Sequence, residues 1–139
     1  MLFACNVSYA ATVNQDSVKA AFIYHFINFI QWEDNKPECY VCIPDDKALR
    51  DTSQQILEGK IVNDRKIMVV KKSQTCHIMV SNYYMSSMSA MLTIGDLNKG
   101  ASLEFRTVNN KLKFAINLNK IKNSHLKISS QLLKLAISE

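Results

Sequence analysis

The strongest hydrophobic pattern of the chain lies near its start and predicts an amphipathic helix. Apolar side chains recur there with helical spacing, at Val18, Ala21, Phe22, Phe26, Phe29 and Ile30. The polar run Asn14-Gln15-Asp16-Ser17 supplies capping residues for the helix start, and we expect the helix to end near Trp32. His25 and Asn28 interrupt the apolar stretch, which falls short of the roughly 18 residues of a membrane span. The pattern therefore predicts a buried helix rather than a transmembrane one.

Beyond this helix, apolar runs bounded by turn residues predict strands that alternate with shorter helices. We expect strands at Glu38–Ile43, Arg65–Val70, Cys76–Val80, Met91–Ile94, Ser102–Val108 and Lys111–Ile116. Helices are predicted at Lys47–Glu58, Tyr83–Ala90 and Ser129–Ile137. Pro44-Asp45-Asp46 starts the first of these helices and Gly59 stops it, while Asn109-Asn110 suits a tight hairpin turn. The order predicts an α/β fold in one domain, with a mixed sheet of about five to six strands, helices on both faces and a C-terminal β-hairpin.

The length of 139 residues fits one domain, and the first residues indicate export. They carry no charge, and Ser8-Tyr9-Ala10-Ala11 places small residues where a signal peptidase cleaves. We interpret residues 1–11 as the remnant of a secretory signal peptide whose basic start is missing because the start codon is assigned too far downstream. Residues 12–139 then form the mature domain. The rival interpretation, a lipobox ending at Cys5, is disfavoured because Phe3 is bulky for that motif.

Charge is unevenly distributed along a chain whose net charge is +5. The last part is rich in lysine and has no acidic residue before Glu139, its lysines being Lys111, Lys113, Lys120, Lys122, Lys127 and Lys134. A solvated basic surface explains this pattern, and a surface for an acidic partner or for anionic lipid headgroups is the sharper alternative. We expect no binding of nucleic acid, because no basic run is interleaved with aromatic residues.

No pattern of residues that carries catalysis is present. The chain has only three glycines, too few for a glycine-rich phosphate loop. His25, His77 and His125 are far apart and lack metal-ligand spacing, and on their apolar elements His25 and His77 are expected to be packed histidines. Asp45-Asp46 is expected to cap a helix. We therefore predict no catalytic residue, no cofactor and no metal, and we expect that the protein is not an enzyme.

Export allows the cysteines to form a disulfide, because disulfides persist outside the cytoplasm. Cys39 and Cys42 lie three residues apart on a predicted strand, so they point to opposite faces and should not bond each other. A disulfide between Cys42 and Cys76 would close a loop of 34 residues (76 minus 42), worth about 3–4 kcal/mol of stability. Two buried free thiols are the alternative, and we favour the disulfide. Cys39 would then be free or would pair between two chains.

Six segments in order resemble the YfiR/HmsC-like family of periplasmic proteins. They are Val18–Trp32, Tyr40–Ile43, Leu57–Arg65, Cys76–Ser81, Phe114–Asn117 and Leu126–Ala136, similar to the family's "VKAAFLYNFxKFxxWP" helix, its first core strand, "LxGKxVxxR", "CHILFIS" and its "FxIN…LKLSSxLLxLA" ending. The matching positions that we expect to be structural are Phe22, Trp32, Gly59, Arg65, Asn117, Ser129 and Ser130. Glycines of the family are absent at Pro44-Asp45-Asp46 and at Ala101, so any ligand contact that needs close backbone approach there is in doubt.

The resemblance implies a regulatory function. Proteins of this family repress an inner-membrane diguanylate cyclase through its periplasmic domain, which lowers cyclic di-GMP and biofilm formation. No catalytic residue carries over, and the cysteines at the matching positions, Cys42 and Cys76, carry over as a structural disulfide. The sequence leaves open a homodimer and also a second function, that of a small-molecule sensor or carrier. A ligand would then bind at the carboxyl ends of the strands, near Pro44–Asp46, Ser81-Asn82 and Gly95-Asp96.

Overall fold

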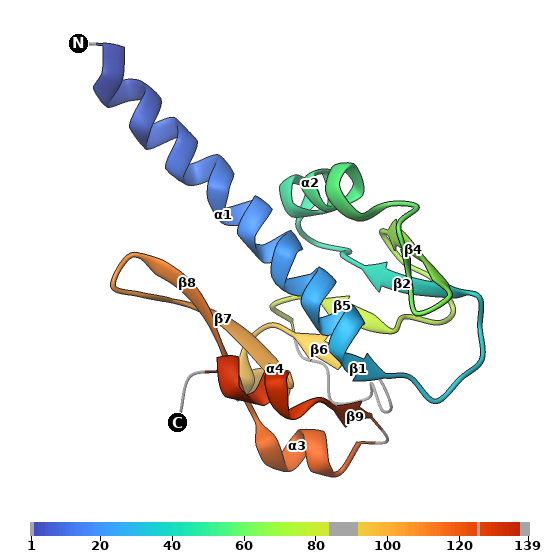
Figure 1. Ribbon diagram of the computed structural model, residues 1–139. Coiled ribbons are helices and arrows are strands. Elements are labelled where there is room, and N and C mark those ends of the chain that lie inside the picture. Colours follow the sequence, from blue (N-terminus) through green and yellow to red (C-terminus); the bar gives the residue numbers. More distant parts are fainter. Residues whose placement is uncertain (1, 84–91, 125, 137–139) are drawn as a thin grey trace.

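A mixed β-sheet of seven strands forms the centre of the protein (Figure 1). The computed structural model describes residues 2–83, 92–124 and 126–136, and for residues 2–14 it describes the backbone alone. In spatial order the strands are β3 (Ile61–Val62), β4 (Arg65–Val70), β2 (Glu38–Cys42), β5 (Ile78–Val80), β6 (Leu92–Ile94), β7 (Leu103–Val108) and β8 (Lys111–Ile116). The five inner strands run parallel, and the edge strands β3 and β8 run antiparallel to their neighbours.

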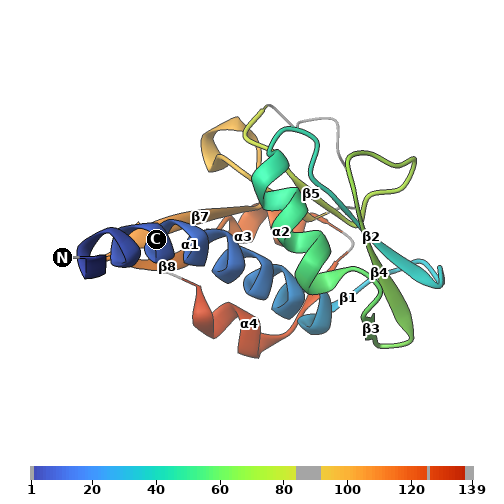
Figure 2. The same cartoon turned by 90° about the horizontal axis from the view of Figure 1, so that it is seen from above.

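The helices surround this sheet unevenly. They are α1 (Leu2–Phe29), α2 (Lys47–Leu57), the 3₁₀ helix η1 (Leu97–Lys99), α3 (Leu118–Lys122) and α4 (Ser130–Leu135). Figures 1 and 2 show α1 and α2 side by side over the sheet, with the N-terminal half of α1 extending beyond it. No helix in the described part of the chain is both long enough and apolar enough to cross a membrane.

The first helix is held to the sheet by an aromatic cluster. Phe26 is fully buried and meets Phe114 of β8 edge to face, with ring centroids 5.1 Å apart. Phe22 contacts the same ring at 5.5 Å and Phe105 of β7 at 6.0 Å. Such pairs add to the burial energy of the rings. Phe22 therefore joins α1 to the β7–β8 hairpin.

The structure confirms the α/β class, the mixed sheet and the hairpin. The strands at Arg65–Val70 and Lys111–Ile116 have the predicted bounds. Asn109 and Asn110 have φ values of 52° and 65°, the left-handed pair that a tight hairpin turn requires. The sheet has one or two more strands than predicted, because β3 is a two-residue strand without a detectable sequence pattern.

Both predicted bounds of the first helix need correction. The first helix begins at Leu2 rather than at residues 14–17, since no proline or glycine interrupts the residues before Asn14. It ends at Phe29, before Trp32, because residues Ile30–Gln31 form β1 and pair antiparallel with β9 (Lys127–Ile128). The 3₁₀ helix, α3 and both strands of this small sheet were not predicted. The helix expected over 83–90 lies almost wholly outside the described residues.

Candidate functional site

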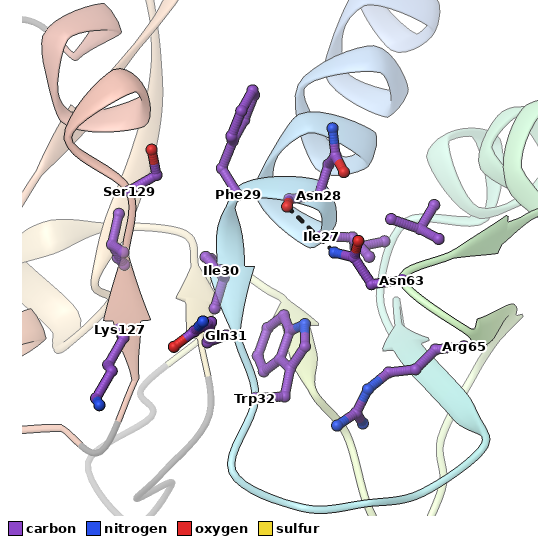
Figure 3. Close-up of a pocket in the computed structure, with 12 residues that line it drawn as sticks. Ile27, Asn28, Phe29, Ile30, Gln31, Trp32, Asn63, Arg65, Lys127 and Ser129 are labelled. Atoms are coloured by element: carbon purple, nitrogen blue, oxygen red, sulfur yellow. Dashed lines mark hydrogen bonds between the residues drawn. The ribbon is translucent and has the colours of Figure 1, made fainter.

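A cleft of about 710 Å³ lies where the small β1–β9 sheet meets the β3 edge of the large sheet (Figure 3). Its lining is partly apolar and partly polar, and comprises Ile27, Asn28, Phe29, Ile30, Gln31, Trp32, Val62, Asn63, Arg65, Lys127, Ile128 and Ser129. Asn63 has φ 52°, and its Nδ2 donates to the backbone oxygen of Asn28 across 3.3 Å. Segments from both ends of the chain and from its middle therefore form one surface.

The β9 side of the cleft is fixed by Ser129. Its backbone N–H donates to the carbonyl of Phe29 at 3.0 Å, which extends the pairing of β1 with β9. Its Oγ accepts from the N–H of Gln131 at 3.1 Å and caps α4. Ser130 is the first helical residue and is exposed. Leu132 is fully buried, whereas Leu133 is 36% exposed.

A network of three charged or polar side chains supports the other side of the cleft. Arg65 Nη1 lies 2.5 Å from Asp34 Oδ1, and Nη2 donates to the Asp34 backbone oxygen. His77 Nε2 lies 2.8 Å from Asp34 Oδ2. The side chain of Arg65 is 12% exposed, that of His77 4% and that of Asp34 33%. Asp34 thus ties the loop after β1 to strand β4 and to the residue before β5.

The hydrogen bonds define the protonation state of His77. Its Nδ1 accepts from the backbone N–H of Tyr40 at 3.0 Å, so this nitrogen carries no proton. The proton must lie on Nε2, which donates to Asp34. Burial lowers the pKa of His77 and outweighs the opposing effect of the Asp34 carboxylate. Burial alone would raise the pKa of Asp34, but hydrogen bonds from Arg65 and His77 lower it. The network is therefore a neutral histidine beside an ion pair.

Trp32 connects the network to the cleft. Its ring meets His77 edge to face, with centroids 5.5 Å apart and an interplanar angle of 82°. Tyr40 stacks on His77 at 6.3 Å. The indole Nε1 of Trp32 is buried and has no hydrogen-bond partner among the described residues. A polar group in this state costs free energy unless a bound molecule satisfies it.

The structure contains the disulfide between Cys42 and Cys76. The two Cα atoms are 5.8 Å apart, within the range that disulfides require. Cys39 points to the other side of the sheet, into the core, and is free and fully buried. Burial raises the pKa of its thiol to about 12. A disulfide between the Cys39 residues of two chains would require opening of the core. The Cys42–Cys76 disulfide fits an oxidising compartment.

Gly59 and Asn117, which also match the family motifs, lie outside the cleft lining and have structural roles. Gly59 follows α2 with φ +84° and donates its N–H to the Ile67 carbonyl at 2.8 Å, a conformation that favours glycine. Asn117 follows β8 and precedes α3. Its Oδ1 accepts from the N–H of Lys120 at 3.1 Å and so caps α3.

A second, smaller crevice of about 310 Å³ lies at the carboxyl ends of the parallel strands. The chain passes from β2 to β4 on one side and then to β5 on the other side of β2, so the strand order reverses between β2 and β5. Such a switch point is where open α/β sheets bind ligands. Ser81 donates to Asp45 at 2.6 Å across this point. The crevice includes Asp45, Asp46, Ser81, Asn82 and Gly95, residues at which the sequence placed it.

The chemistry of both cavities suits binding. No group of three or more His, Cys, Asp or Glu side chains in the described ranges is placed to hold a metal ion. The large cleft offers amide groups and the cation of Lys127 beside an apolar wall that includes Trp32. Sequence reasoning missed Asp34, which stands in a loop without periodic pattern. The signals that point to its network are Trp32, Arg65 and His77, each of which lies in a segment of the family resemblance.

Comparison with protein-family models identifies the class. The model described as YfiR/HmsC-like matches residues 16–137. The chain therefore belongs to the YfiR/HmsC-like family. A search of curated proteins finds no match.

Proposed function

We propose that this protein is a periplasmic regulator that binds the periplasmic domain of an inner-membrane diguanylate cyclase and represses it. The observation that carries the proposal is the family match over residues 16–137. The Cys42–Cys76 disulfide supports export to an oxidising compartment. In this proposal residues 1–11 are removed as a signal peptide, which N-terminal sequencing of the exported protein tests.

The large cleft is the surface that we assign to the cyclase. It is formed by Trp32, Arg65 and Ser129, three of the positions at which the sequence matches the family motifs. Its apolar wall and its hydrogen-bond donors are the combination that protein interfaces use for affinity and orientation.

Cellular cyclic di-GMP tests the proposal. Deletion of the gene should raise cyclic di-GMP in a source cell whose membrane cyclase has a periplasmic domain, and the wild-type gene should restore the low level. A Gln31→Arg variant places a bulky cation in the cleft and should fail to restore it. Gln55→Arg is the matched control, because Gln55 is exposed on α2 and outside the cleft. Unchanged cyclic di-GMP after deletion contradicts the proposal.

The switch-point crevice supports a second candidate function, the binding of a small ligand that releases repression. Its position between the ends of β2 and β5 is the observation that favours this function. A ligand that binds only the folded protein raises its melting temperature. A metabolite panel that leaves the melting temperature unchanged removes the grounds for this candidate.

A further inference from the structure

The charge of the protein is separated along the chain. Residues 105–138 contain seven of the 17 lysine and arginine residues and none of the 12 acidic residues. The rest of the chain contains the other ten basic residues and all the acidic ones, so it is slightly acidic. The cationic excess of the protein therefore belongs entirely to its C-terminal elements.

These elements lie on one side of the molecule. Strand β8, α3, β9 and α4, in orange to red, run along the lower side of the molecule in Figure 1. Five of their lysines are exposed, and none of them forms an ion pair with a described residue: Lys111, Lys113, Lys122, Lys127 and Lys134. Two other cations are engaged, since Arg106 pairs with Glu104 and Lys120 donates to the carbonyl of Gly100.

Exposed leucines accompany these lysines. Leu118 of α3 is 47% exposed, and Leu133 and Leu135 of α4 are 36% and 57% exposed. Leu133 and Leu135 flank Lys134 in sequence. Apolar side chains among cations, without acidic neighbours, are the chemistry of segments that lie at the surface of an anionic membrane. We call the three leucines and the four lysines other than Lys127, which lines the cleft, the lysine–leucine surface.

We propose that the lysine–leucine surface binds the anionic headgroups of a lipid bilayer, with the leucines entering the headgroup region. An acidic protein domain would be served by the lysines alone, whereas the exposed leucines favour a bilayer. The proposal goes beyond the regulation of a cyclase and rests on it only for the location beside the inner membrane. Binding would hold the protein in the plane of its membrane partner and raise its local concentration there.

Sedimentation of the purified protein with lipid vesicles tests the proposal. We expect binding to phosphatidylcholine vesicles that contain a minority of phosphatidylglycerol, weaker binding as salt rises, and no binding to phosphatidylcholine alone. Each lysine removed should weaken binding about fivefold. The triple variant Lys113→Gln, Lys122→Gln, Lys134→Gln should therefore lose roughly a hundredfold. It leaves out Lys127, which lines the cleft.

The matched control is Lys66→Gln, Lys71→Gln, Lys72→Gln, three exposed lysines outside the C-terminal elements. It should bind like the wild type, and circular dichroism should show that both triple variants are folded. Leu135→Ser should weaken the binding that survives at high salt. Absence of binding to anionic vesicles overturns the proposal, and this is the result expected if the surface binds an acidic protein instead. An equal loss of binding in the control variant also overturns it. The assay contains no cyclase, so its outcome is independent of whether repression is found.

Discussion

Removing the disulfide should lower stability by an amount that follows from its loop. Cys42 and Cys76 are separated by 34 residues. Cross-linking a loop of this length should stabilise the folded state by about 4 kcal/mol through the restricted unfolded chain. Domains have total stabilities of about 5–15 kcal/mol, so the Cys42→Ala, Cys76→Ala variant should be marginally stable. With a denaturant slope of about 2 kcal/mol per molar, the urea midpoint should fall by about 2 M.

Urea unfolding followed by circular dichroism measures this loss. The bonded cysteines are buried, so a reductant reaches them only when the protein is unfolded. Wild-type protein that is unfolded and refolded in reductant should therefore lose the disulfide and show the same lower urea midpoint as the double variant. Reductant should leave the double variant unchanged. Cys39→Ala is the control that removes a buried thiol without a cross-link. A loss below about 1 kcal/mol in the double variant, or a loss as large in Cys39→Ala, would refute the loop argument.

Three further predictions follow from the network, α4 and the hairpin. Burial lowers the folded-state pKa of His77 from 6.5, so the unfolded chain binds the proton more readily and stability should fall as pH drops below 6.5. Urea midpoints at neutral and mildly acidic pH should show this fall in the wild type and a smaller fall in His77→Gln. Leu132→Ala should lower stability by about 2–5 kcal/mol because Leu132 is fully buried. Leu135→Ala, at an exposed site, should change stability by less than about 0.5 kcal/mol. Equal losses of stability in thermal unfolding of the two variants would contradict the packing of α4. Asn110→Val should lower stability by about 1–2 kcal/mol because Asn110 has φ 65°, and Asn110→Gly should leave stability unchanged. A valine variant as stable as the wild type would show that the turn does not have this left-handed conformation.

The parts of the fold that were predictable are those with a local signal. The hairpin could be located from alternating side chains on both sides of Asn109-Asn110, and both strands were found with bounds correct to within one residue. The disulfide could be predicted because Cys42 ends β2 and Cys76 stands two residues before the neighbouring strand β5, each within an apolar run. In both cases the residues that form the feature also carry the pattern that reveals it.

The cleft could not be predicted, because its parts have no local signal. Strands β1, β3 and β9 are two residues long, too short for any periodicity. The contact between Asp34 and Arg65 joins residues 31 apart, and nothing in the loop around Asp34 indicates its partner. The helix start was misplaced because the polar residues at 14–17 can cap a helix but can also lie inside one. A chain without glycine or proline before them can remain helical.

Pairing of β1 with β9 makes the cleft one of the last parts of the protein that can form as the chain is delivered from its N-terminus. Ile30 pairs with Ile128, and the Phe29 carbonyl accepts from Ser129, so the two walls of the cleft lie almost a hundred residues apart in the sequence. Long-range pairing of this kind must wait for the intervening sheet, because closing the loop costs entropy before the contact forms. A nascent or C-terminally truncated chain can therefore build the sheet while lacking the proposed partner surface. Binding of the proposed partner would begin only when β9 has been delivered and has paired with β1.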